Sequence, residues 1–562
     1  MALGVPREID TVIVGNGPSA LILSYILHGN IPSYDESSPH PDHILHDKLH
    51  GCHNDLLDFD VDALTDHFAA SRFSYSTQAL PVNVLLDTLV RPLGETDDAQ
   101  KKTCVKWRYD PSRAVEHVIV GNTKSAGGQW VDNPVHASWD IGTLSYAGML
   151  SLPGYSFDEH YKRRNGRSSP VYLRPSRREV ADYLAAYPEQ VGIAKYIHNG
   201  QHIAQVSRRD EGGFYIGSHD ILCKTLVLAS GIFDTLIPTP AMLDPLIGLD
   251  HNVAASSSSN SSSPDPILVV GSGFSAADVI ISTPSNQKII HVYKWAPTTS
   301  PSPLRACHQQ AYPEYAGVYR RMKLAAISTP QPKDRRPRPR NLRSHSDFDV
   351  SRDWKATYEG LPNAEILDVK LTDEGLALVT FTFKDGDERS SFQRRINSLA
   401  YVVGRRGSLD YLSTDLRAEF LAGDCGGMIS GQTLREQANE DLEIAPHVFV
   451  IGSLTGDSLI RFAYGGCAYA AGKIMKRSRS RSDNATTTAP PSTRSSGRRE
   501  NDVARPDGNG IIRLSSMLND GNDQSETATP SPQIPAMNGL DGHEAGPMSL
   551  ANGGMPLDRR KD

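Results

Sequence analysis

The chain has 562 residues, of which 38% are apolar and 22% are charged, and its formal net charge is −7. That length predicts two or three domains, and the composition supports sizeable globular cores with some disordered sequence. The small net charge argues against nucleic acid as a main partner. The six cysteines are scattered without a CxxC pair, which excludes a local thiol–disulfide centre and a zinc ribbon and fits a reducing compartment.

The first predicted elements are a strand at Thr11–Gly15 and a helix from about Ser19 to Leu27, within the stretch VIVGNGPSALILSYIL. Three interpretations fit this stretch: a membrane segment, a phosphate-binding turn, or an ordinary strand and helix of a core. A membrane-spanning helix needs roughly 18 or more apolar residues, and here glycines and a proline interrupt a shorter run. We therefore expect no membrane span.

The turn between this strand and this helix has the pattern GxGxxA, which is typical of dinucleotide-binding folds. The first glycine permits a tight turn, the second lets the backbone approach a pyrophosphate, and the small third residue lets helix and strand pack closely. The free N–H groups and positive end of the helix then face the phosphates. A glycine turn needed only for packing is the alternative. The residues predicted to bind a cofactor here are Gly15, Asn16, Gly17, Pro18, Ser19 and Ala20.

In such folds an acidic residue about 20 positions after the turn binds the adenosine ribose. Asp35 and Glu36 lie at that distance, but no convincing strand precedes them. The next clear strand is HVIVG (His117–Gly121), which is followed by Asn122 rather than by an acid. Three possibilities stay open: Asn122 binds the ribose, Asp35 or Glu36 does so, or the contact is missing.

Polar and apolar residues alternate over Gln201–Gly231, which predicts a β-meander that ends in a buried strand at Thr225–Ala229. The serine-rich segment at residues 251–266 predicts a flexible connection between domains. A second strand–turn–helix unit then begins with Ile267–Val270. Its turn repeats the GxGxxA pattern, and its candidate binding residues are Gly271, Gly273, Phe274, Ser275 and Ala276.

Two such turns, each between a strand and a helix, favour two nucleotide sites more strongly than either turn does alone. The usual pairing is FAD at the N-terminal site and NAD(P)H at the internal one. The strand predicted after the second turn, Lys288–Trp295, carries Lys294 near its end instead of an acid. A cation there favours the 2′-phosphate of NADP over the free 2′-hydroxyl of NAD; the alternative is an exposed edge lysine.

The C-terminal strand His447–Gly452 is followed by Gly456-Asp457 and a helix rich in small residues. In flavoproteins such an aspartate binds the ribityl chain, so Gly456 and Asp457 are candidate FAD ligands; the alternative is that Asp457 only caps the helix. Beyond residue 476 the chain is rich in Ser, Thr, Pro, Asn and Gly, which predicts a disordered tail. A basic run at residues 473–482 allows nuclear targeting, but the cytoplasm is expected because no targeting segment is evident.

Several stretches of the chain resemble one family, the oxidative-stress-induced growth inhibitors, and the resemblance runs from roughly Ile9 to Met475. These stretches are GNGPSA, GNTKSAGGQW, LSLPGYSFDEHYKRR, LVLASGIFD, YPEYAGVYRRM and LTGDSLIRFAYGG. The GGQW motif is similar to the GGxW of class B flavin monooxygenases, which lies beside the flavin. The segment around LVLASG resembles the strand-to-linker segment of flavoproteins with two dinucleotide sites. The resemblance therefore adds to the cofactor-binding set Gly127, Gly128, Gln129, Trp130 and Gly231.

The resemblance implies an FAD- and NADPH-dependent monooxygenase. NADPH would reduce FAD, O₂ would add to give a C4a-(hydro)peroxyflavin, and that species would transfer one oxygen atom to a small-molecule substrate. The cofactor carries this chemistry, so no catalytic acid or base is assigned and no metal is expected. Two alternatives are an amine N-hydroxylase of the ornithine or lysine type, and a regulatory growth-control protein that holds a structural flavin with little turnover.

The expected fold is α/β, with two Rossmann-like dinucleotide-binding domains and a disordered C-terminal tail. The FAD-binding domain would be discontinuous, formed by residues 1–250 and 393–476. The NADPH-binding domain, residues 267–392, would be inserted after the serine-rich linker at 251–266. The tail would comprise residues 477–562.

Overall fold

The structure is a computed structural model that describes residues 7–51, 55–73, 75–93, 102–247, 249, 266–328, 348, 352–373, 375–385, 388–421 and 427–487. Residues 251–265 of the predicted linker and residues 488–562 of the predicted tail lie outside these ranges. Among the described helices, none combines the length and the apolar character that crossing a lipid bilayer requires.

The first sheet has eight strands and is built around β1 (Arg7–Val14). Its other strands are β4 (His117–Val120), β5 (Ile197–His198), β6 (Val206–Arg208), β7 (Phe214–Ile216), β8 (Ile221–Leu228), β19 (Glu443–Ala445) and β20 (Val448–Val450). β1 lies between two parallel neighbours, β8 and β4, and the parallel order continues outward to β20 and β5. The predicted meander is confirmed, because β6, β7 and β8 pair antiparallel in sequence.

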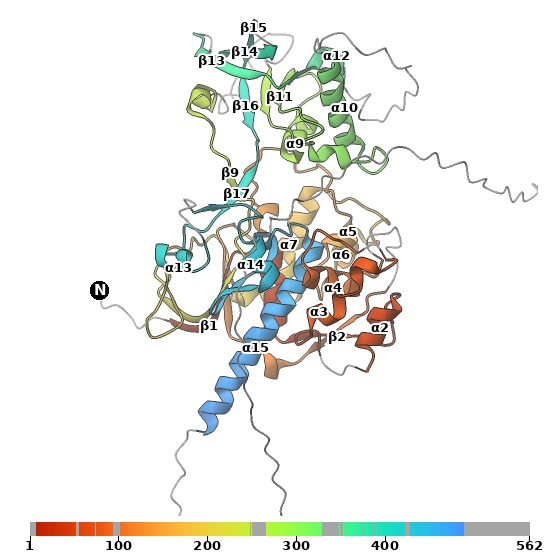
Figure 1. Ribbon diagram of the computed structural model, residues 1–562, viewed down its shortest axis with the longest axis vertical. Coiled ribbons are helices and arrows are strands. Elements are labelled where there is room, and N and C mark those ends of the chain that lie inside the picture. Colours follow the sequence, from red (N-terminus) through yellow and green to blue (C-terminus); the bar gives the residue numbers. More distant parts are fainter. Residues whose placement is uncertain are drawn as a thin grey trace, which may run out of the picture. The chain divides into compact units, whose positions relative to one another are not determined.

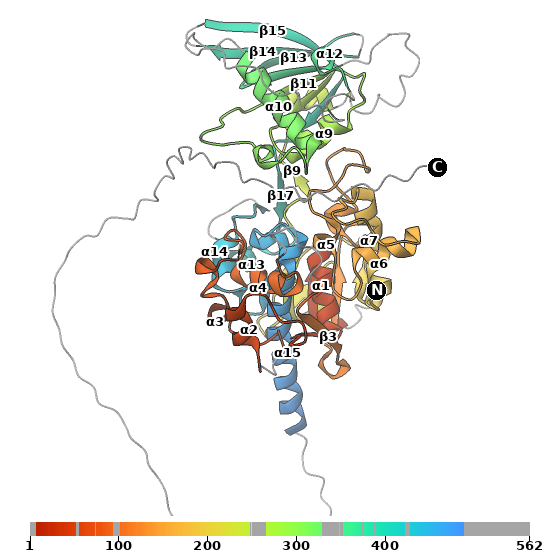
Figure 2. The same ribbon diagram turned by 90° about the vertical axis from the view of Figure 1, so that its right-hand side faces the viewer.

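Alternate residues of β1 point to opposite faces of this sheet, and each face has its own core. Ile13 packs with α1 (Pro18–Leu27), α4 (Pro81–Val90), α7 (Arg177–Gln190) and α15 (Tyr464–Thr487). Val12 and Val14 pack on the other face with the meander, α13 (Thr414–Ala418) and α14 (Arg435–Glu440). Burial on both faces explains why β1 ends in a continuous apolar run. Figure 2 shows α15 beside α1 and α4, and α4 can also be followed beside α15 in Figure 1.

The first part of the chain also contains short elements outside the eight-stranded sheet. β2 (Asn30–Tyr34) and β3 (Val105–Tyr109) pair antiparallel with each other in a separate two-stranded sheet. The remaining helices of this part are α2 (His43–Leu49), α3 (Val61–Thr65), α5 (Ala147–Leu150) and α6 (Phe157–Asn165).

Helix α15 packs closely because of its small residues and continues past residue 476. A Cβ on Gly465 would clash with the backbone of Val82, so only glycine permits this approach. The helix runs on to Thr487. Within its basic run, Lys473 pairs with Asp441 at 2.6 Å, so at least one of these cations stabilises the packing of the helix.

The second sheet repeats the same plan with four parallel strands. They are β10 (Ile267–Val270), β11 (Ile289–Tyr293), β12 (Tyr358–Pro362) and β16 (Ser398–Tyr401), in the order β12-β11-β10-β16. One face packs against α9 (Phe274–Ser282), α10 (Pro313–Ser328) and α12 (Trp354–Thr357). The other face packs against the antiparallel strands β13 (Glu365–Leu371), β14 (Ala377–Asp385) and β15 (Glu388–Ile396) (Figure 1). The predicted α/β class with two Rossmann-like units is thus confirmed.

The chain leaves the first sheet at β9 (Thr235–Leu236) and returns to it at β17 (Arg405–Ser408), and these two strands pair antiparallel. β18 (Met428–Ile429) extends this small sheet. Two predicted boundaries therefore shift. The helix α8 (Asp244–Ile247) belongs with the second part, because Leu246 is buried in its core. The end of β15 and all of β16 also belong there, past the expected boundary at residue 392, because β15 pairs with β14 and β16 pairs with β10. A strand as short as β16 does not show in its sequence which sheet it joins.

Candidate cofactor-binding site

The first GxGxxA turn follows β1 and borders a cavity of about 490 Å³. Gly15 has a φ of +110°, and a Cβ there would clash with the backbone of Ala229, so the fold itself requires this glycine. Gly17 is different, because its φ of −77° suits any residue and no atom lies within 4 Å of the position that its Cβ would occupy. The glycine at position 17 therefore leaves open space in the cavity rather than relieving a clash within the chain.

The N-terminus of α1 contributes to this cavity. Gly17 is the N-cap residue and provides no side chain to bond the first N–H groups of the helix, and Gly17, Pro18 and Ser19 all line the cavity. Such an end binds anionic groups through its free N–H groups and its dipole. Ala20 lies outside the cavity, fully buried in the core between helix and sheet, where the pattern requires a small residue.

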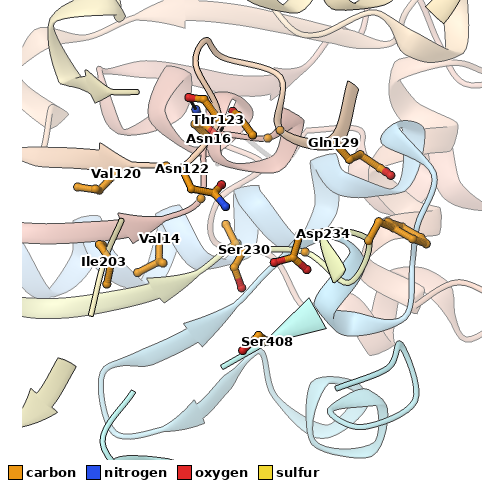
Figure 3. A pocket seen from close by; sticks show the side chains of 18 of the residues that line it. Val14, Asn16, Val120, Asn122, Thr123, Gln129, Ile203, Ser230, Asp234 and Ser408 are labelled. Atoms are coloured by element: carbon orange, nitrogen blue, oxygen red, sulfur yellow. Dashed lines mark hydrogen bonds between the residues drawn. The ribbon is translucent and has the colours of Figure 1, made fainter. Parts of the chain in front are cut away.

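Asn16 fixes the loop that follows β4. Its side chain is 2% exposed and donates to Asn199 Oδ1 at 2.7 Å, while its own Oδ1 accepts from Thr123 Oγ1 at 2.8 Å. Figure 3 shows Asn16 and Thr123 against each other beside Asn122. The backbone of Asn16 borders the cavity, but its amide is engaged with the protein, so this predicted cofactor ligand acts by positioning the loop.

The three possibilities for the ribose contact are distinguished by where their residues lie. Asn122 follows β4 directly beside β1 and lines the cavity, where its amide projects toward Ser230 (Figure 3). Asp35 follows β2, a strand that the sequence did not reveal, and pairs with Lys106 at 2.6 Å. Glu36 accepts from the backbone N–H of Gly51 at 2.9 Å. Neither acid lines the cavity, so Asn122 is the one of these three residues that borders it.

The GGQW segment divides into two parts. Gly128 and Gln129 line the cavity, and a Cβ on Gly128 would lie 3.1 Å from the Cα of Gly17. Gly127, with a φ of +130°, packs instead against Val131, and Trp130 packs against the main core. Gly231 also lines the cavity. Two of the four residues of the GGQW segment therefore border the cavity, and the other two serve the fold.

The structure places Gly456 and Asp457 away from the lining of the cavity. Asp457 is 6% exposed and accepts hydrogen bonds from the Leu80 N–H at 2.9 Å and from Asn83 Nδ2 at 2.7 Å. It also forms an ion pair with Arg435 at 2.7 Å. Neither the flavin contact nor a cap of α15, which begins at Tyr464, matches this geometry.

After β20 the cavity is lined by Ile451, Gly452 and Ser453, none of which was predicted as a cofactor ligand. Their position directly after the C-terminal strand is the feature of the sequence that could have identified them. Asp234, next to β9, and Ser408, in β17, also line the cavity and were not predicted. Asp234 ends the stretch LVLASGIFD, from which only Gly231 was assigned, whereas no motif contains Ser408. Desolvation by the atoms around it raises the pKa of the Asp234 carboxyl above its usual value, although the residue as a whole is exposed.

The second GxGxxA turn borders a cavity of about 760 Å³ and repeats the geometry of the first. Gly271 has a φ of +147°, and a Cβ there would meet the backbone of Val402. Gly273 is extended, with a φ of −101°, and has no atom within 4 Å of its Cβ position. Phe274 and Ser275 line the cavity, whereas Ala276 is buried behind it. Lys294 is exposed, lines the cavity and has no ion-pair partner in the part of the chain that the structure describes.

His291 of β11 forms a hydrogen bond with the backbone of this second turn, a contact that the sequence did not predict. The imidazole is fully buried; Nε2 lies 2.7 Å from the carbonyl oxygen of Gly271, and Nδ1 lies 2.8 Å from the Tyr358 hydroxyl. Because a carbonyl only accepts, Nε2 carries the proton and Nδ1 accepts from Tyr358. Burial lowers the pKa of His291 to about 4, so the ring is neutral at pH 7.

Two residues connect the two cavities. Phe233 lines both of them. Arg405 lines the second cavity and donates to Gln129 Oε1, in the lining of the first, at 3.1 Å. Its guanidinium carbon lies 4.9 Å from the centre of the Phe233 ring. Ligands bound at the two turns would therefore share a boundary at these side chains.

Comparisons with known proteins agree with the resemblance in the motifs. No family model matches the chain. The chain is 25% identical over 516 residues to oxidative stress-induced growth inhibitor 1 of Mus musculus, a match that covers 84% of this chain and 96% of that protein. It is 24% identical over 504 residues to a Caenorhabditis elegans homolog of this inhibitor, covering 83% and 94%. The predicted resemblance to this family is thus confirmed.

Solved structures also resemble this chain, among them the following two. One is a flavin-containing monooxygenase from Stenotrophomonas maltophilia, with 13% identity, coverage of 85% of this chain and 99% of that chain, and a TM-score of 0.43. The other is an ornithine N-hydroxylase from Kutzneria sp. 744, with 12% identity, coverage of 85% and 100%, and a TM-score of 0.43.

Proposed function

We propose that this protein is an FAD- and NADPH-dependent monooxygenase, with FAD in the first cavity and NADPH in the second. The observation that carries this proposal is the shared geometry of the two turns. In each, the first glycine is required by the fold, while the second leaves open space before a helix N-terminus. A purely structural turn has no need of that second glycine, whereas a pyrophosphate does.

The residues of the first cavity fit the parts of FAD. Gly17, Pro18 and Ser19 would bind the pyrophosphate at the N-terminus of α1. Asn122 would bind the adenosine ribose with its amide in place of the usual acid. Gly128, Gln129 and Gly231, together with Gly452 and Ser453, would border the remainder of the cofactor.

When bound, the two cofactors would supply hydride transfer and the activation of O₂. The chain's own residues would orient them and exclude water. Phe233 and Arg405 stand where the two cavities adjoin, and Gln129 fixes the guanidinium there. Asp234, with its raised pKa, would hold a proton at the edge of the first cavity. The substrate would be a small molecule.

The visible spectrum of the purified protein tests this proposal, followed by NADPH oxidation with and without oxygen. We expect a yellow protein whose flavin NADPH reduces and oxygen reoxidises. A colourless protein that takes up no FAD on reconstitution would contradict the cofactor assignment.

Lys294 is proposed to select NADPH through the 2′-phosphate. Its ammonium is exposed, borders the second cavity and has no carboxylate partner among the described residues. Replacing Lys294 with alanine should lower the preference for NADPH over NADH by roughly tenfold, which corresponds to one lost charge-assisted contact of about 1.4 kcal/mol. The ratio of kcat/KM for the two nucleotides measures this, with Lys323→Ala on α10, away from the cavity, as the control. An unchanged ratio would remove Lys294 from the site.

The names of the relatives support a second function, the control of growth, in which the flavin is retained but turns over little. The same experiment separates the two. A protein that is yellow but never oxidises NADPH with oxygen, whatever candidate amine or sulfide is added, favours the regulatory function. Faster NADPH oxidation with ornithine or lysine would instead identify an amine N-hydroxylase.

A further inference from the structure

A third cavity, of about 410 Å³, adjoins the loop that follows the GGQW segment. The side chains that give it its character are Asn122, Lys124, Asp132, His136, Trp139 and Arg177. Its lysine and arginine, Lys124 and Arg177, are two cations against a single acid, Asp132, so these side chains give the lining a net positive charge. None of the functions considered above uses this cavity.

Arg177 is the unusual member of this lining. Arg177 is only 8% exposed, and its Nε is buried without a hydrogen-bond partner. One face of the guanidinium stacks on Trp139, with 4.1 Å between its carbon and the ring centre. Within the described ranges no carboxylate lies within ion-pair distance. Burial lowers the pKa of Arg177, and Asp278 and Asp132 oppose this only from farther away.

The position of Arg177 in the chain makes its positive charge electrostatically less favourable still. It is the first residue of α7, whose N-cap Ser176 forms a capping box with Glu179. A cation at this end of a helix is unfavourable, whereas an anion is stabilised there. A buried arginine without an acid partner is rare, because the desolvation of its charge is not offset. The first N–H groups of α7 are already bonded within the protein, so an anionic ligand here would satisfy the guanidinium and the net charge of the lining.

We propose that this cavity binds the carboxylate or phosphate group of a small molecule, with Arg177 as a bidentate ligand and Lys124 as a second cation. The planar guanidinium matches both oxyanions through two parallel N–H donors. Asn122 and Asp132 line this cavity and the first one as well, so the ligand would lie beside the first cavity. The proposal does not depend on the flavin assignment.

Calorimetric titration of the full-length protein with inorganic phosphate, and separately with succinate, tests this proposal. We expect saturable binding of at least one of these ions to the wild type. Arg177→Gln should weaken it by about tenfold or more, because it removes a bidentate charge-assisted pair. Arg178→Gln is the matched control: Arg178 is the next residue, has a side chain that is 57% exposed, and pairs with Asp140 at 3.1 Å. Arg178→Gln should bind the anion with the affinity of the wild type.

Two further measurements complete the test. Without anions, Arg177→Gln should unfold at a temperature no lower than the wild type, because the substitution removes an unpaired buried charge. If Arg177→Gln does not fold, Lys124→Gln replaces it in the titration. Lys124 is exposed, and its substitution should weaken anion binding several-fold. Repeating the titration with saturating ADP identifies the source of the anion. Loss of the phosphate signal assigns the cavity to a nucleotide phosphate, and its persistence assigns it to a separate substrate. No saturable binding by the wild type, or equal binding by Arg177→Gln, would overturn the proposal.

Discussion

Replacing Gly17 with leucine is expected to give a folded protein that has lost its flavin. No atom lies within 4 Å of the position that the new Cβ would take, and the backbone there suits any residue. The leucine would project into the space in front of the first turn of α1, where the pyrophosphate would lie. Flavin content per polypeptide, from the visible absorbance of the purified protein, should fall from near one to near zero, while the melting temperature without added FAD stays close to that of the wild type without FAD.

Two other glycines make this experiment specific. Gly273→Leu places the same side chain at the matching position of the second turn. That variant should remain yellow but should no longer be reduced by NADPH. Gly15→Ala, in contrast, would clash with the backbone of Ala229 at a positive φ and should lower the stability itself. A Gly17→Leu protein that keeps its yellow colour would show that the flavin is bound elsewhere.

Both turns were predictable from the sequence because their geometry is local. The roles of Gly15, Gly17 and Ala20 are set by neighbours within a few residues, namely one strand, one turn and one helix. The same holds for the second unit around Gly271. Sequence alone therefore identified the fold class and the positions of both cavities.

Contacts between distant segments were not predictable in this way. Asn122 borders the first cavity because β4 pairs with β1, across more than a hundred residues of chain. Asp35 has the expected spacing, but β2 pairs with β3 in a separate sheet, which removes this acid from the cavity. No sequence motif marks His291 or Arg177. Their contacts are with residues distant in the chain: His291 with the carbonyl oxygen of Gly271, and Arg177 with the ring of Trp139.

Asp457 is the clearest case, because its sequence suggested flavin binding and its partners indicate stability. Replacing it with alanine should lower the free energy of unfolding by on the order of 3–5 kcal/mol. The variant would leave the buried N–H of Leu80 and the amide of Asn83 without their acceptor and Arg435 without its ion-pair partner. Urea denaturation of the protein saturated with FAD measures this loss. Asp140→Ala, which removes an exposed aspartate paired with Arg178, should cost no more than about 1 kcal/mol.

The same variant separates the two roles of Asp457 through its spectrum. If Asp457 holds α4 and Arg435 in place without contacting the cofactor, the fraction of Asp457→Ala that folds should bind FAD with the affinity and absorbance of the wild type. Asp457→Asn should lose less stability, because an amide oxygen can still accept from Leu80 or Asn83. A variant with wild-type stability but a much weaker affinity for FAD would reverse this assignment and make Asp457 a flavin ligand. We expect instead a large loss of stability with unchanged affinity for FAD, because Asp457 contacts Leu80, Asn83 and Arg435 of the protein itself.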